Sequence, residues 1–146
     1  MYVESAENME KQKATQINPV TLAFLGDAVY SLYVREKLVK SGTGKVADFQ
    51  RSASKVVSAK GQSAFLDKVL PLLNEDEAEI FRRGRNAKKP TKSKHATACE
   101  YARSTGFEAV LGYLHLIGQK ERIEQLLSLI DEADLQGQSA EKVYKP

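Results

Sequence analysis

Two acidic residues stand alone inside strongly apolar stretches of this sequence. Asp27 is the only acid in residues 18–34, and Glu108 is the only acid in residues 106–118. A carboxylate in such surroundings must find a cation, a metal ion or several hydrogen-bond donors, because burying an unpaired charge is costly. Carboxylate oxygens suit Mg²⁺, which keeps several waters and takes one or two protein carboxylates plus substrate phosphates. The pair therefore indicates either metal-assisted chemistry on a phosphate or a structural carboxylate–lysine contact.

A run of basic residues, here called the basic stretch, lies between the two acids in the chain. Residues 82–94 contain no acid and seven basic side chains, which are Arg82, Arg83, Arg85, Lys88, Lys89, Lys92 and Lys94. Asn86, Thr91 and Ser93 are interleaved as neutral hydrogen-bonding groups. Such a stretch typically contacts phosphates, and the alternative is a loop that is merely solvated.

The composition is that of a globular domain. The chain has 146 residues, of which 42% are hydrophobic and 28% charged, and a formal net charge of +3. Its single cysteine, Cys99, excludes an internal disulfide and has no partner for a zinc site. The N-terminal residues are polar, and no stretch is apolar and long enough to span a bilayer. We therefore expect a cytoplasmic protein with no membrane partner.

Apolar residues recur at helical spacing along most of the chain, which predicts an all-α fold. Asn18 can cap the first long helix, and Asn74 with Glu77 has the pattern of a capping box. Gly26 weakens its helix, so we expect another backbone to approach closely there, whereas Gly84 is expected to end a helix. The predicted helices are 18–40, 46–58, one from about 64 to 70, 74–83, 95–104, 106–118 and 119–133.

Two motifs carry a resemblance to a known family. Residues 22–29, Leu-Ala-Phe-Leu-Gly-Asp-Ala-Val, resemble the signature of ribonuclease III catalytic domains, usually Leu-Glu-Phe-Leu-Gly-Asp-Ala-Val. Residues 107–112, Phe-Glu-Ala-Val-Leu-Gly, resemble the second acidic motif of that family, and residues 51–58 resemble its third helix. The resemblance divides the chain into an N-terminal arm or short peripheral helix (1–17), a ribonuclease III-like catalytic domain (18–133) and a short polar tail (134–146).

Two departures from the family pattern indicate which branch of the family the sequence resembles. Ala23 and Thr105 stand where long-form enzymes carry acids, so that Asp27 and Glu108 are the two that remain of the usual four. The residues after 133 are too few for the double-stranded-RNA-binding domain of the long-form enzymes. Together with residues 83–88, these features resemble the Mini-III branch, which consists of the catalytic domain alone.

The resemblance implies a homodimeric endoribonuclease that depends on Mg²⁺, with Mn²⁺ as a substitute. Its implied substrate is double-stranded RNA, in particular the 23S ribosomal RNA precursor, whose ends it matures with the help of a large-subunit ribosomal protein. Asp27 and Glu108 are then the catalytic and metal-binding residues, and the RNA-binding residues are Arg82, Arg83, Arg85, Asn86, Lys88, Lys89, Lys92 and Lys94. A non-catalytic protein of the same fold that binds structured RNA or assists ribosome assembly is the alternative, and a helical protein-interaction module is a third.

Overall fold

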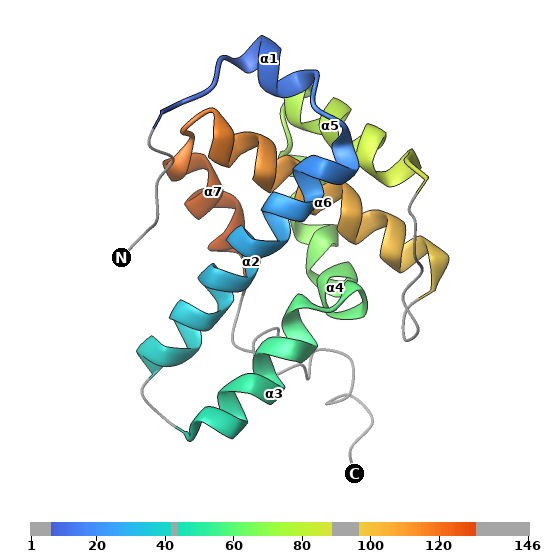
Figure 1. Ribbon diagram of the computed structural model, residues 1–146. Coiled ribbons are helices and arrows are strands. Elements are labelled where there is room, and N and C mark those ends of the chain that lie inside the picture. Colours follow the sequence, from blue (N-terminus) through green and yellow to red (C-terminus); the bar gives the residue numbers. More distant parts are fainter. Residues whose placement is uncertain (1–6, 42–43, 89–96, 131–146) are drawn as a thin grey trace.

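The computed structural model describes residues 7–41, 44–88 and 97–130, which are helical and contain no strand (Figure 1). The predicted all-α fold is therefore confirmed. No helix within these ranges is long and apolar enough to cross a membrane. The elements are α1 (Lys11–Thr15), α2 (Pro19–Ser41), α3 (Val46–Val57), α4 (Ala59–Val69), the 3₁₀ helix η1 (Leu70–Leu72), α5 (Glu75–Asn86), α6 (Ala98–Leu116) and α7 (Lys120–Leu127).

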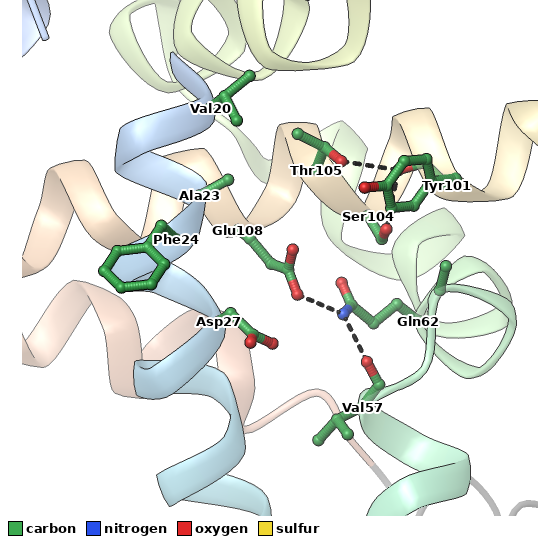
Figure 2. Close-up of a pocket in the computed structure, with 11 residues that line it drawn as sticks. Val20, Ala23, Phe24, Asp27, Val57, Gln62, Tyr101, Ser104, Thr105 and Glu108 are labelled. Atoms are coloured by element: carbon green, nitrogen blue, oxygen red, sulfur yellow. Dashed lines mark hydrogen bonds between the residues drawn. The ribbon is translucent and has the colours of Figure 1, made fainter. Parts of the chain in front are cut away.

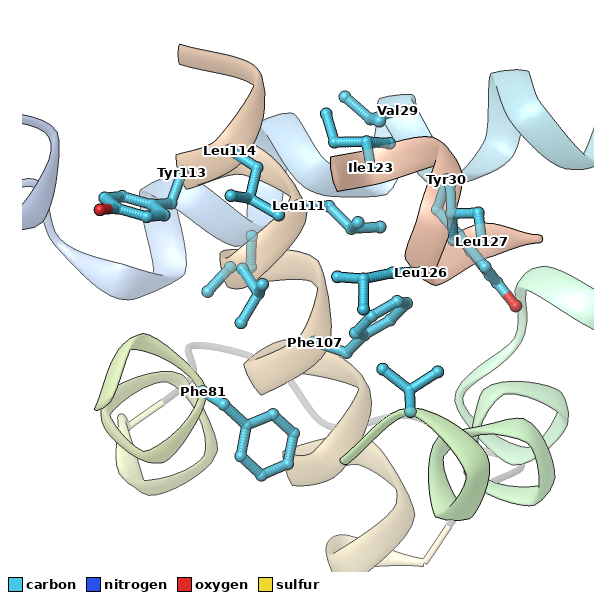
Figure 3. Packing of buried hydrophobic residues seen from close by; sticks show 14 of the residues in the cluster. Val29, Tyr30, Phe81, Phe107, Leu111, Tyr113, Leu114, Ile123, Leu126 and Leu127 are labelled. Carbon is cyan, nitrogen blue, oxygen red and sulfur yellow. The ribbon is translucent and has the colours of Figure 1, made fainter. Parts of the chain in front are cut away.

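Helix α6 is the central element, and α1, α2, α4, α5 and α7 pack against it. Between Ser104 and Leu114 every residue of α6 except Glu108 is buried, as expected for a helix that is apolar on all sides. Figure 3 shows Phe107 and Leu111 of α6 packed with Leu126 of α7. The core therefore surrounds α6, and Glu108 is the residue of its buried segment that is not fully covered.

The crossing of α2 and α6 depends on two glycines. A Cβ atom on Gly26 would lie 1.7 Å from the carbonyl oxygen of Glu108, and one on Gly112 would lie 2.0 Å from that of Leu22. Each glycine thus lies directly against the backbone of the other helix. The close approach expected at Gly26 is confirmed, and it brings the Asp27 segment beside Glu108.

A second glycine crossing corrects two of the predicted boundaries. Helix α5 does not end at Gly84, which is buried where α5 meets α6, and a Cβ there would lie 2.9 Å from Cα of Gly106. Gly106 in turn does not separate two helices, because α6 continues unbroken from Ala98 to Leu116. The packing gained by close helix contact outweighs the low helix propensity of glycine.

Capping residues account for the helix starts that the sequence predicted well. The Oδ1 atom of Asn18 accepts a hydrogen bond from the backbone N–H of Val20 at 2.8 Å. Asn74 and Glu77 form the predicted capping box, with bonds of 2.9 and 3.0 Å. Thr97 and Glu100 form another at the start of α6, which therefore begins later than the predicted residue 95.

Adding a methyl group at the α2–α6 crossing should destabilise the fold. We expect Gly26→Ala or Gly112→Ala to lower the free energy of unfolding by about 3 kcal/mol or more, because each Cβ must displace a backbone carbonyl. Helix propensity alone predicts the opposite sign, a gain of about 1 kcal/mol. Denaturant unfolding measures the change. The control is Ala28→Gly at an exposed position of α2, which reports the effect of helix propensity alone. Unchanged or raised stability in Gly26→Ala would contradict the close crossing.

Candidate active site

Asp27 of α2 and Glu108 of α6 line the same pocket, which has a volume of about 370 Å³ (Figure 2). Both side chains point into the space between α2, α6 and the junction of α3 with α4. The structure thus brings together the two acids that the sequence singled out. The remaining lining residues are Val20, Ala23, Phe24, Val57, Ala59, Gln62, Tyr101, Ser104 and Thr105.

The two acids differ in exposure, and this corrects the expectation that both lie in buried surroundings. Asp27 is exposed, and its neighbour Phe24 is 83% exposed. Helix α2 buries the face that carries Leu22, Gly26 and Tyr30, so Asp27 and Phe24 are left at the rim of the pocket. The argument from a buried charge therefore applies to Glu108 rather than to Asp27.

Glu108 is half-buried, and its environment raises the pKa of its carboxyl group to about 8. Burial is the main cause, because it penalises the charged form, and the nearby Asp27 carboxyl group acts in the same direction. A hydrogen bond from Gln62 opposes the rise in pKa. No lysine or arginine of the described residues lines the pocket. These observations favour an added cation over the alternative of an internal carboxylate–lysine pair.

Gln62 is a site residue that the sequence did not reveal. It is fully buried, and its Nε2 atom donates hydrogen bonds of 3.0 Å to the carbonyl oxygen of Val57 and to Oε2 of Glu108. Its Oε1 atom is buried and has no hydrogen-bond partner in the described part of the chain. One feature of the sequence could have indicated that Gln62 is buried. Ser58 caps α4 and so places Gln62 in the first turn of that helix, one turn before Phe65, which is also buried.

Ala23 and Thr105, the positions that depart from the family pattern, also line the pocket. The Thr105 hydroxyl donates to the carbonyl oxygen of Tyr101 at 3.0 Å, and the hydroxyl of Ser104 donates to the same oxygen at 2.9 Å. No group of three or more His, Cys, Asp or Glu residues that could hold a metal occurs in the described ranges. Among the described residues, the charged oxygen ligands that the pocket offers a cation are the carboxylates of Asp27 and Glu108, and the amide oxygen of Gln62 is a neutral acceptor in the same pocket.

The first arginines of the basic stretch already have protein partners. Arg82 forms an exposed ion pair with Glu79 at 2.6 Å. Arg83 donates to the carbonyl oxygen of Thr15 at 2.7 Å and so links α5 to the end of α1. Arg83 therefore has a structural contact that the sequence did not predict.

The rest of the basic stretch lies at the end of α5 and beyond it. The guanidinium group of Arg85 lies 5.8 Å from the ring centroid of Phe81, and its Nε atom donates to Asn86 at 3.3 Å. Lys88 is exposed, and none of the described members of the stretch lines the pocket. Three further predicted RNA-binding residues lie outside the described residues, namely Lys89, Lys92 and Lys94.

Comparison with known protein sequences and structures supports the family resemblance that the two motifs carry. Residues 20–119 match the Ribonuclease III domain family. A protein from Symbiobacterium thermophilum called Mini-ribonuclease 3 is 50% identical over 109 residues, which cover 75% of this chain and 84% of the relative. A protein of the same name from Thermoanaerobacter sp. is 41% identical over 128 residues, covering 88% and 90%. The X-ray structure of a Fusobacterium nucleatum protein matches with a TM-score of 0.72 and 29% identity, covering 79% of this chain and 92% of that one.

These matches confirm the resemblance carried by the two motifs, which meet at the α2–α6 crossing. The chain belongs to the ribonuclease III family. Within that family its relatives are the Mini-ribonuclease 3 proteins, and the chain is accordingly an endoribonuclease.

The raised pKa of Glu108 should make the metal-free protein less stable at higher pH. The folded state keeps a proton up to about pH 8, whereas the unfolded chain loses it near the ordinary pKa of 4.5. The resulting stabilisation is complete below pH 4.5 and is lost as pH rises through about 8. In EDTA we expect the free energy of unfolding to fall by about 2–4 kcal/mol between pH 5 and 8.5. Glu108→Gln should lack this part of the pH dependence, and parallel curves for the two proteins would contradict the shift.

Proposed function

We propose that Asp27 and Glu108 bind Mg²⁺, with Mn²⁺ as a substitute, and that this site cleaves double-stranded RNA. The observation that carries the proposal is the shared pocket, in which two carboxyl groups from separate motifs meet and no basic side chain of the described residues joins them. The donor set fits the ion, because carboxylate oxygens are hard ligands and Mg²⁺ fills its remaining positions with water and phosphate.

The mechanism that we infer is direct hydrolysis, which leaves a 5′-phosphate and a 3′-hydroxyl. The bound ion would supply activation of the attacking water and stabilisation of the leaving oxygen. Asp27, at the exposed rim of the pocket, would hold the ion on the side from which a phosphate can enter. Glu108, deeper in the pocket, must release its proton to bind the ion, and the hydrogen bond from Gln62 favours that ionised form.

The substrate surface that we propose is the basic stretch. Duplex RNA is recognised through its shape, its phosphates and its 2′-hydroxyl groups, so basic side chains suffice without stacking aromatics. Lys88 is exposed, and the Arg82–Glu79 ion pair is exposed and can exchange for a phosphate. From the resemblance to the Mini-III branch we infer that the substrate is the 23S ribosomal RNA precursor in the cytoplasm, with a large-subunit ribosomal protein as a partner.

We also infer that the protein is a homodimer. Phe24 is 83% exposed beside the pocket, and Val39 and Val46 are 65% and 70% exposed. We infer the dimer from the resemblance to the Mini-III branch, and a second copy would be able to cover exposed apolar side chains such as Phe24. A twofold axis would present two sites to one duplex, one for each strand.

The metal role of Asp27 is tested by Asp27→Asn, which keeps the shape of the side chain and removes its charge. We expect Mg²⁺-dependent cleavage of a duplex RNA to fall at least a hundredfold, while the fold and RNA binding remain. Cleavage is followed on gels, with EDTA added to the wild-type protein as the control. Full activity in the variant would contradict the assignment.

The same assay tests the alternative raised from the sequence, a non-catalytic protein that binds structured RNA, which the family match disfavours. Its support is that Ala23 and Thr105 line the pocket at the positions where long-form enzymes carry acids. A mobility shift without any Mg²⁺-dependent product from the wild-type protein would favour that function.

The basic stretch is tested through the salt dependence of RNA binding. Replacing Lys88, Lys89, Lys92 and Lys94 together by alanine should weaken binding and flatten the slope of log affinity against log salt, by about 0.7–0.9 for each lost phosphate contact. Lys40→Ala combined with Lys120→Ala, on α2 and α7, is the control and should leave the slope unchanged. An unaltered slope in the fourfold variant would show that these lysines do not contact phosphate.

A further inference from the structure

We propose that Gln62 is a positioning residue of this site. In this proposal Nε2 of Gln62 holds the carboxyl group of Glu108 in the orientation that binds the divalent cation, and Oε1 accepts a hydrogen bond from a water of that cation. The inference rests on the proposed function, since it takes Glu108 to be a ligand of the ion. It adds a residue that belongs to neither of the two acidic motifs.

The orientation of the Gln62 amide is fixed by its surroundings. A backbone carbonyl can only accept hydrogen bonds, so the atom 3.0 Å from the oxygen of Val57 must be the amide nitrogen. The same nitrogen lies 3.0 Å from Oε2 of Glu108 and donates its second hydrogen there (Figure 2). One nitrogen thus connects the carboxyl group to the backbone at the end of α3.

That backbone is in turn attached to the helix that carries Asp27. The hydroxyl of Tyr30, on α2, donates to the carbonyl oxygen of Val56 at 3.3 Å. The backbone N–H of Gln62 donates to the carbonyl oxygen of Ser58 at 2.9 Å, which holds the first turn of α4 against the same junction. The contacts therefore run from the Asp27 helix through the α3–α4 junction to Glu108. Groups that orient ligands in this way commonly change metal affinity by about 10–100-fold when they are removed.

The unpartnered Oε1 atom of Gln62 indicates that the amide does more than fill space. Buried side-chain oxygens almost always have a donor, and this one has none among the described residues. The neighbouring hydroxyls of Ser104 and Thr105 donate to Tyr101 instead. An apolar side chain of the same length would fill the position without an unsatisfied oxygen. A donor from outside the chain is therefore expected, and hydrated Mg²⁺ at the two carboxylates would bring one.

Gln62→Met tests the proposal, because methionine keeps the length and the buried volume and removes both polar atoms. The full chain is titrated with Mn²⁺ without RNA, and free Mn²⁺ is followed by its electron paramagnetic resonance signal. We expect the variant to bind Mn²⁺ at least tenfold more weakly than the wild type while retaining its helical circular dichroism. Val69→Ala is the matched control, since Val69 is a buried residue of α4 that does not line the pocket, and its affinity should stay within twofold.

A second measurement uses the wild-type side chain and does not depend on the folding of a Gln62 variant. In ¹⁵N-labelled protein, the side-chain amide resonances of Gln62 should shift when Mg²⁺ is added and should not shift in Asp27→Asn. Equal Mn²⁺ affinity in folded Gln62→Met, or Gln62 resonances that Mg²⁺ leaves unmoved, would each overturn the role of Gln62 while leaving the metal site in place. A wild-type protein that binds neither cation would instead overturn the proposed function.

Discussion

The contact between the backbones of α2 and α6 is the constraint on which the rest of this structure depends. Gly26 lies against the carbonyl of Glu108, and Gly112 lies against that of Leu22, so neither helix can rotate or slide without a clash. Asp27 follows the first glycine directly, and the second follows Glu108 by one helical turn. The same residues that permit close packing therefore fix the two acids relative to each other.

This packing places the acids where they oppose stability. Burial of Glu108 penalises its charged form and the Asp27 carboxyl group adds to the penalty, which is why the pKa of Glu108 lies near 8. A fold selected for stability alone would replace one of the acids. Strongly perturbed groups in a pocket are typical of functional sites, where a ligand supplies the missing charge. Gln62 belongs to the same arrangement, since it donates to one oxygen of Glu108 while its own oxygen has no donor among the described residues.

Much of the fold could be predicted because its signals are local. Asn18 and the Asn74–Glu77 capping box mark helix starts through contacts within one turn. The predictions were wrong where contact with a distant segment decides the structure. At Gly84 the predicted helix end is wrong because α5 packs closely on α6 there and continues to Asn86. The exposure of Phe24 depends on which face of α2 is covered by α6. Gln62 was missed because its partners come from α3 and α6, and no sequence spacing brings such groups together.

Because α6 is continuous, the number of its residues fixes the distance between its first residue and Glu108. The basic stretch leads to its first residue, Ala98, and Glu108 lies ten residues later, about 15 Å along the helix axis. In the proposed RNA complex, the number of residues in α6 would set the distance between a phosphate bound near Ala98 and the bond being cut. Because the backbone of Glu108 is held against α2, one residue inserted between Ala98 and Glu108 would turn the start of α6 by about 100° relative to the two acids. The number of residues between Ala98 and Glu108 is therefore constrained, because each added residue changes the direction in which the start of α6 faces.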